Sequence, residues 1–281
     1  LFGCETELTK DLILGLSKER YDEFATFLAE NGYAVFVHDH LGHGESVESD
    51  DNLGFFGEED GWKNLVNDCY TITKYAREIF PGKPVVLFGH SMGSFIARAY
   101  TQMYDMTLAA AIYCGTSGSN PAAGMGIKLA DAIARSKGAK HKSELITSVA
   151  FGTYNKKIKP HRTAFDWLSR DNAEVDKYVA DDYCGFMFTA CGFRDLFSVL
   201  KFVSVKNWYK SVRKSLPILF VSGDADPVGE YGKGVKQVVT DLKKTGHDNI
   251  EMKLYKDSRH EILNDFDRHI VMEDILNWLE K

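Results

Sequence analysis

The stretch Val85 to Gly93, which reads VVLFGHSMG, decides the fold of this chain. Its first four residues form a short apolar run typical of a buried strand, and a helical pattern over 95–104 follows it. The pattern Gly-x-Ser-x-Gly at this strand-to-helix turn leaves the serine hydroxyl exposed, because the small residues Gly89 and Gly93 let neighbouring backbone approach. Ser91 is therefore our candidate nucleophile. Its neighbour His90 is interpreted as a packing residue of the turn.

Strands and helices alternate on both sides of this stretch. The periodicity predicts buried strands over residues 33–37, 85–88, 108–114, 218–222 and 250–255. It predicts helices over residues 21–31, 62–80, 95–104, 233–244 and 266–279. Strands that alternate with helices indicate an α/β fold, in which helices cover both faces of a mostly parallel sheet.

One long interruption divides this pattern. Over residues 119–215 the periodicity is helical and shows no convincing buried strand. We interpret this segment as a helical cap inserted between a first part of the core, 1–118, and a second part, 216–281. The inserted segment holds 17 Lys and Arg against nine Asp and Glu, whereas the whole chain carries a net charge of -6. It is therefore predicted to be a basic cap over an acidic body.

Composition narrows the class of protein. The chain has 281 residues, of which 44% are apolar, enough for a sizeable core. The net charge of -6 argues against a general nucleic-acid binder. Five cysteines without a close pair indicate neither a disulfide framework nor a zinc ribbon. With no signal-peptide pattern and no apolar run long enough for a membrane span, we expect a cytoplasmic protein, and the sequence leaves its oligomeric state open.

A serine nucleophile needs a histidine to take its proton and a carboxylate to orient that histidine. The strand over 218–222 runs into Gly-Asp-Ala-Asp-Pro at 223–227, which offers Asp226 as the acid and Asp224 as the alternative, a turn-capping residue. His260 follows the next strand and completes the chain order Ser, Asp, His. His247 precedes that strand and His269 lies in the last helix, so both are less well placed.

A second cluster, HDHLGHG over 38–44, superficially resembles a metal site. His38 and His40 are expected on one strand face with Asp39 opposite, and the sequence holds no second ligand cluster of comparable density. We therefore interpret these residues as a tight glycine turn with hydrogen-bonding histidines beneath the active site. The sequence predicts neither a metal nor an organic cofactor.

Together these motifs resemble the α/β-hydrolases of the monoacylglycerol lipase and lysophospholipase group, also described as serine aminopeptidase-like. The resemblance rests on GHSMG at 89–93, DHLGHGES at 39–46, GDADP at 223–227, RHE at 259–261 and WLSRD at 167–171. It implies the α/β-hydrolase fold and a Ser91, His260 and Asp226 triad. It also implies an oxyanion hole made by the backbone N–H groups of Met92 and Leu16, although Leu14 stands where the group usually has a histidine.

The function predicted from these residues is hydrolysis of an acyl ester, a monoacylglycerol or a lysophospholipid, through an acyl-enzyme. The cap is expected to form one wall of the acyl pocket. Its weak amphipathic helix over 126–136 either docks onto the core or makes peripheral contact with a membrane. Two alternatives stay open: an aminopeptidase-type enzyme, whose cap carboxylates Asp181 or Asp182 hold a substrate ammonium, and a catalytically silent binding protein.

Overall fold

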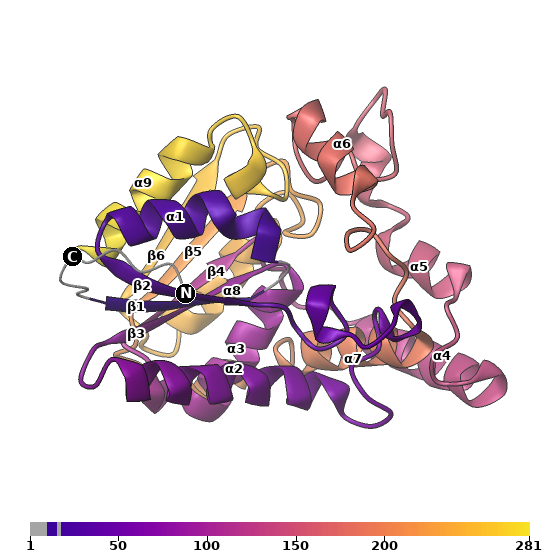
Figure 1. Cartoon of the computed structure of the whole chain (residues 1–281), viewed down its shortest axis with the longest axis horizontal. Helices are drawn as coiled ribbons and strands as arrows, with labels where there is room; N and C mark the ends of the chain where they lie inside the picture. Colours follow the sequence, from indigo (N-terminus) through magenta and orange to yellow (C-terminus); the bar gives the residue numbers. More distant parts are fainter. Residues whose placement is uncertain (1–9, 16–17) are drawn as a thin grey trace.

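A six-stranded parallel sheet forms the centre of the computed structural model, which describes residues 10–15 and 18–281 (Figure 1). The strand order is β2-β1-β3-β4-β5-β6, and each neighbouring pair is parallel. The strands are β1 (Lys10–Gly15), β2 (Tyr33–His38), β3 (Val85–His90), β4 (Ala110–Cys114), β5 (Ile218–Gly223) and β6 (Ile250–Tyr255). The α/β class and the strands expected from the sequence are confirmed, and β1 is a strand that periodicity did not single out.

Helices cover both faces of the sheet because each central strand is apolar on both sides. In β3, Val85 and Leu87 enter one hydrophobic core, whereas Val86 and Phe88 enter the other. The first core lies under α2 (Gly61–Ile79), α3 (Met92–Tyr104) and α8 (Lys233–Lys243). The second lies under α1 (Asp22–Glu30) and α9 (Arg268–Leu279). Each fully buried side chain of this size contributes about 1.5–3 kcal/mol, so the two cores fix the sheet that carries the site.

Residues 119–215, which we call the cap segment, lie between β4 and β5. Their helices are α4 (Ala123–Lys137), α5 (Glu144–Phe151), α6 (Asn172–Ala180) and α7 (Ala190–Phe202). α7 packs against α2, α3 and α4, and Figure 1 shows α5 and α6 standing beyond the edge of the sheet. Strand structure in the described cap segment is limited to one isolated bridge, Lys142 with Thr189. α4 contains the helix predicted over 126–136.

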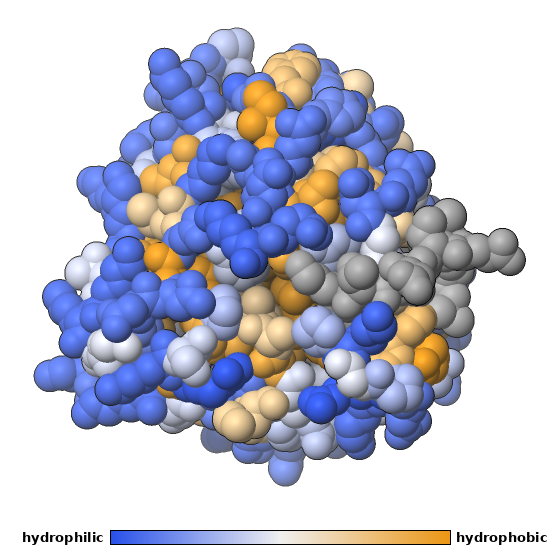
Figure 2. Space-filling model, turned by 90° about the vertical axis from the view of Figure 1, so that its left-hand side faces the viewer, coloured by the Kyte–Doolittle hydropathy of each residue, from blue (hydrophilic) through white to orange (hydrophobic). Residues whose placement is uncertain are grey.

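The surface on the left of Figure 1 is mainly hydrophilic, with apolar side chains showing between the polar ones (Figure 2). Scattered apolar surface of this kind is normal for a folded protein. The large cavity described below is lined instead by residues of α4 and α5, which lie on the opposite side in Figure 1. Within residues 10–15 and 18–281, no helix combines the length and the apolar character needed to cross a bilayer.

Candidate active site

Ser91 occupies a strained turn between β3 and α3. Its φ of 54° lies in the left-handed region, which a non-glycine residue rarely adopts outside functional sites. The turn is tight, because a Cβ on Gly89 would lie 2.2 Å from the carbonyl oxygen of Gly93. The N–H of Ser91 donates to the carbonyl of Cys114 over 3.0 Å, which ties the turn to the end of β4. Ser91 is half-buried and lines the large cavity.

The structure brings Asp226 and His260 together. Nδ1 of His260 donates to Oδ2 of Asp226 over 2.9 Å, and both side chains are buried. The other carboxylate oxygen of Asp226 accepts the N–H of Val228 over 2.8 Å. Asp224 is exposed and accepts the N–H of Asp257 over 2.7 Å, so it caps the turn after β6. The geometry therefore favours Asp226 over Asp224 as the partner of the imidazole.

The second ring nitrogen of His260 is available for chemistry. Nε2 is buried and has no hydrogen-bond partner among the residues that the structure describes, and His260 lines the same cavity as Ser91. The ring packs between Trp167 and His90, at centroid distances of 5.0 and 4.6 Å. With Nδ1 committed to Asp226, a neutral ring presents the Nε2 lone pair to the cavity.

His90 has the packing role expected for it. Its Nε2 donates to the carbonyl of His260 over 3.0 Å, and its ring packs edge-on against Tyr21. Burial, together with the nearby His260, lowers the pKa of His90 to about 3. His90 therefore remains neutral near pH 7 and supports the backbone of the His260 loop.

The cap segment holds the His260 loop in place. The N–H of His260 donates to the carbonyl of Trp167 over 3.4 Å, and the N–H of Glu261 donates to that of Leu168 over 2.7 Å. Arg259 adds hydrogen bonds to backbone carbonyls of the same stretch. The WLSRD motif at 167–171 gave no sign of this role, in which the cap segment positions the loop that carries His260.

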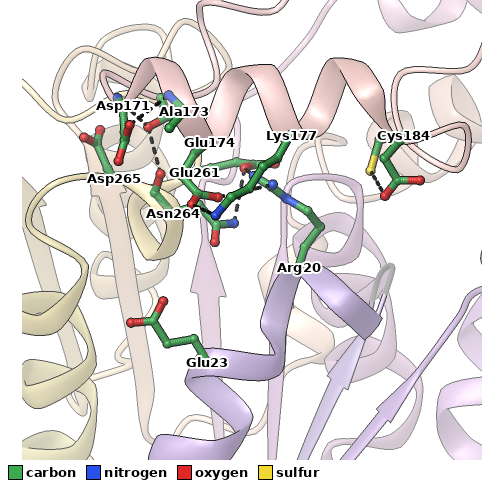
Figure 3. Close-up of polar contacts among 12 residues, drawn as sticks. Arg20, Glu23, Asp171, Ala173, Glu174, Lys177, Cys184, Glu261, Asn264 and Asp265 are labelled. Carbon is green, nitrogen blue, oxygen red and sulfur yellow. Dashed lines mark hydrogen bonds and ion pairs between the residues drawn. The ribbon is translucent and has the colours of Figure 1, made fainter.

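Arg20 joins three parts of the molecule at the rim of the cavity (Figure 3). It lies in the short helix Lys18–Tyr21, pairs with Glu261 of the His260 loop, and approaches Glu174 of α6 at 3.5 Å. Glu174 also pairs with Lys177 over 2.7 Å. Although burial alone lowers the pKa of Arg20, the charge of Glu261 raises it above its usual value. Arg20 is thus a paired cation that links the core to α6, a role that sequence reasoning missed.

The cavity above Ser91 is large and mainly apolar in its walls. Its volume is about 1950 Å³, well above the roughly 300–1,000 Å³ of ordinary small-molecule pockets. Ser91, Met92 and His260 are among the residues that line it. The cap segment supplies much of the wall, including Met125, Leu129, Val149, Phe151, Met187, Phe188, Phe197 and Leu200. A long apolar group can therefore lie beside the serine.

Met92 stands at the N-terminal end of α3, directly after Ser91. It is the first residue of α3, so its backbone N–H has no acceptor within the helix. On the neighbouring strand, β1 ends at Gly15, whose partner in β3 is Gly89. Leu16, the second donor that the resemblance implies, lies outside the described residues.

The histidine cluster after β2 differs from what the sequence predicted. His43 does hydrogen-bond, since its Nδ1 donates to the carbonyl of Leu41 over 3.3 Å, and its ring stacks on Phe56. Burial lowers the pKa of His43 to about 4. The expectation of a hydrogen bond is wrong for His40, because both ring nitrogens are buried without a partner among the described residues. The reason is its position: β2 ends at His38, and the His40 ring turns into packed aromatic surroundings, 4.8 Å from the His38 ring.

The fold and the site together define the class of protein. A parallel sheet with a serine turn after β3, an aspartate after β5 and a histidine after β6 is the arrangement of the α/β-hydrolases. Residues 14–267 match the profile of the family described as serine aminopeptidase, S33. The chain belongs to this family.

Curated relatives and solved structures agree with this assignment. The chain is 26% identical over 263 residues to a monoglyceride lipase homolog of Monkeypox virus, covering 92% of this chain and 84% of the relative. It is 25% identical over 265 residues to a monoacylglycerol lipase of Mycolicibacterium smegmatis, covering 92% and 82%. A thermostable carboxyl esterase from Bacillus coagulans, solved with glycerol, has a TM-score of 0.93 and 29% identity over 99% of this chain and 92% of its own. The chain is accordingly a hydrolase of the monoglyceride lipase-like group.

Proposed function

We propose that this protein is a serine hydrolase that cleaves carboxylic acyl esters, with monoacylglycerols as its main substrates and lysophospholipids as the runner-up. The observation that carries the proposal is the buried Asp226–His260 hydrogen bond, with the unpartnered Nε2 of His260 on the same cavity as Ser91. The names of the relatives, monoacylglycerol lipase and carboxyl esterase, support an ester as the substrate.

The proposed reaction uses groups of this chain alone. Ser91 attacks the ester carbonyl while Nε2 of His260 takes the hydroxyl proton, and Asp226 orients and charge-balances the ring. The N–H groups of Met92 and Leu16 hold the oxyanion. His260 then returns the proton to the leaving alcohol, which gives the acyl-enzyme. It next takes a proton from water while the resulting hydroxide attacks the acyl group. The protonated His260 then returns this proton to Ser91 Oγ, which releases the fatty acid and restores the serine hydroxyl.

We propose residues 119–215 as the cap of this site, forming the wall against which the acyl chain lies. Met125 and Val149 of this segment line the cavity, although 70% and 59% of their surface is exposed. Leu145, one turn before Val149 on α5, is 58% exposed. Apolar side chains at the mouth of a lipid pocket favour peripheral contact with a membrane or micelle surface. The cap segment is thus both the wall of the pocket and its approach to lipid.

An ester fits the cavity better than a peptide with a free amino group. The aminopeptidase alternative requires a carboxylate for the substrate ammonium, but Asp181 is engaged by Tyr183 and Cys184, and neither Asp181 nor Asp182 lines the cavity. Glu261 does line it, but this carboxylate is neutralised by Arg20. Glu144 and Glu230 also line the cavity, but both are exposed, and the lining as a whole is mainly apolar, which suits an acyl chain.

A substrate panel tests the proposal. Purified protein is assayed on p-nitrophenyl esters of increasing chain length, on monoacylglycerols, on lysophospholipids and on aminoacyl amides, with Ser91→Ala as the blank. We expect turnover of monoacylglycerols and medium to long esters that is absent from the blank. Turnover of aminoacyl amides alone would move the function to a peptidase, and folded protein inactive on the whole panel would favour the silent binder.

A further inference from the structure

Three potential metal ligands converge outside the proposed catalytic residues. His38 ends β2, His40 lies in the loop that follows, and Cys69 belongs to α2. One ligand atom from each lies within 4.8 Å of the others, and Cys69 Sγ is 4.0 Å from His38 Nε2. Among the described residues, this is the one group of three or more His, Cys, Asp or Glu side chains whose ligand atoms lie this close together. The three ligand atoms therefore come together from a strand, a loop and a helix that are separate in sequence.

Of the three residues, His40 gives the strongest indication that the group binds a ligand. Its side chain is 1% exposed, and neither ring nitrogen has a hydrogen-bond partner in the part of the chain that the structure describes. A buried polar group left in this state destabilises the folded protein. A neutral imidazole carries one lone pair that can bind a metal ion, and in His40 a ligand nitrogen faces Cys69 and His38.

We propose that His38, His40 and Cys69 bind one thiophilic divalent transition-metal ion, for which Zn²⁺ is the best match. Two imidazoles and one thiolate suit zinc, whereas Mg²⁺ and Ca²⁺ require oxygen ligands. Three protein ligands leave one tetrahedral position for water. Binding replaces the thiol proton, so that Cys–SH and M²⁺ give a Cys–S–M⁺ unit and one H⁺.

The ion ties the loop after β2 to α2. Cys69 is 3% exposed, so bulk solvent has little access to its thiolate. The same loop carries His43, which stacks on Phe56 and lines the cavity. To reach metal-bond lengths the three ligand atoms must draw together by roughly 1 Å. The site therefore stabilises one wall of the cavity and takes no part in the ester-cleaving step.

Cobalt provides a direct test, because Co²⁺ bound to a thiolate gives a charge-transfer band and tetrahedral Co²⁺ gives intense visible bands. Protein stripped with chelator is titrated with Co²⁺ alone and then with Zn²⁺, and bound metal is counted by native mass spectrometry. We expect one Co²⁺ per chain, displaced by Zn²⁺, and a rise in Tm on addition of Zn²⁺.

Two variants and two controls make the result specific. Cys69→Ser is expected to abolish the charge-transfer band and to weaken Zn²⁺ binding by more than roughly 100-fold, and His40→Gln to weaken it in the same direction. Cys191→Ser, which alters a buried cysteine of α7 outside the cluster, and His260→Ala, which removes the cavity histidine, are expected to retain the wild-type band. If Cys69→Ser fails to fold without metal, His40→Gln carries the test. Wild-type protein without the band, or a band unchanged in both cluster variants, overturns the proposal.

Discussion

His260 and His40 each follow a parallel strand and are each only 1% exposed, but the surroundings of their ring nitrogens differ. His260 has a carboxylate on one nitrogen and the cavity at the other. His40 has no hydrogen bond to described residues and does not line the cavity, although Cys69 lies near it. Burial of a histidine after a strand is therefore not enough to make it a general base. The carboxylate and the access to a cavity distinguish the two sites.

The largest effect is expected on kcat, from variants of Ser91 and His260. Ser91→Ala and His260→Ala are each expected to lower kcat for ester hydrolysis by a factor of at least about 10⁴, because triad members act as a unit. Circular dichroism checks that the variants fold, and His269→Ala, a change at an exposed histidine of α9, serves as the matched control. Near-normal turnover in either triad variant contradicts the assignment.

The next pair of variants tests whether Asp226 or Asp224 is the carboxylate that orients His260. Asp226→Asn is expected to reduce kcat by about 10⁴, because the amide no longer holds the imidazole in the required tautomer. Asp224→Asn changes an exposed cap of the turn at Asp257, and we expect a loss below about tenfold. Measuring kcat for both variants on one ester decides the matter, and the opposite ranking transfers the role to Asp224.

The free energy of unfolding is expected to fall in acid, in part because of His43. The folded-state pKa of this histidine, lowered by burial to about 4, lies below its usual value of 6.5, so the unfolded chain takes up the proton first. The free energy of unfolding is therefore complete above about pH 6.5, falls as the pH drops toward 4, and no longer changes below that on account of this group. His43 alone is expected to remove up to about 2 kcal/mol between pH 6.5 and about pH 5.

Urea unfolding at the two pH values tests this expectation. His43→Gln removes the titrating group and should reduce the loss of stability between them by a similar amount. His269→Gln, at an exposed position, should leave the pH dependence unchanged. A His43→Gln protein with the full wild-type pH dependence would show that other groups cause it.

A smaller effect separates His40 from a well-bonded buried histidine. In metal-free protein, His40→Leu is expected to leave the free energy of unfolding unchanged or raise it by up to about 1 kcal/mol, because it removes a buried polar group without a partner. His247 is equally buried, but its nitrogens bond to the backbone of Val212 and to Thr245. His247→Leu should therefore cost about 1–3 kcal/mol. Equal losses in the two variants, measured by urea unfolding with chelator, would mean that His40 is satisfied in solution.

The smallest predicted effect tests the charge of the cap segment. Lys156 and Lys159 are exposed and line the cavity, so anionic surfaces should be drawn toward it. We expect monoacylglycerol in anionic vesicles to be cleaved faster than in neutral ones, and added salt to erase the difference. The double variant Lys156→Glu and Lys159→Glu should lose this preference.

The matched control for that experiment puts the same charge change on the core. Lys236 and Lys243 are exposed on α8 and do not line the cavity. Replacing both by Glu changes the net charge equally and should leave the vesicle preference intact. Equal rates in both vesicle types at low salt would make the basic cap segment a feature of solubility only.

Local pattern was sufficient to predict most of the fold. The apolar run before Ser91 and the helix after it fixed the β3–α3 turn, and alternation along the chain indicated the parallel sheet. The strand β1 was harder to predict, because its apolar run is limited to Leu12, Ile13 and Leu14, between Asp11 and Gly15. The loops after β5 and β6 were found because parallel strands bring their carboxyl ends to one edge.

What the sequence could not supply are contacts between distant segments. The pairing of Arg20 with Glu261 spans 241 residues, and no periodicity indicates it. Cys69 lies on α2, 31 residues after His38, so a search for close ligand spacing overlooks it. The prediction that the His40 ring is hydrogen-bonded was wrong, because the position of the ring depends on packing around the loop rather than on the order of residues.

Covalent labelling tests the central claim most directly. A fluorophosphonate probe is incubated with wild-type protein, with Ser91→Ala and with Ser148→Ala, a change at another serine that lines the cavity, and the labelled peptide is mapped by mass spectrometry. The account predicts one label on Ser91, retained in Ser148→Ala and absent from folded Ser91→Ala. Folded wild-type protein that takes no label, or label that persists in Ser91→Ala, contradicts it.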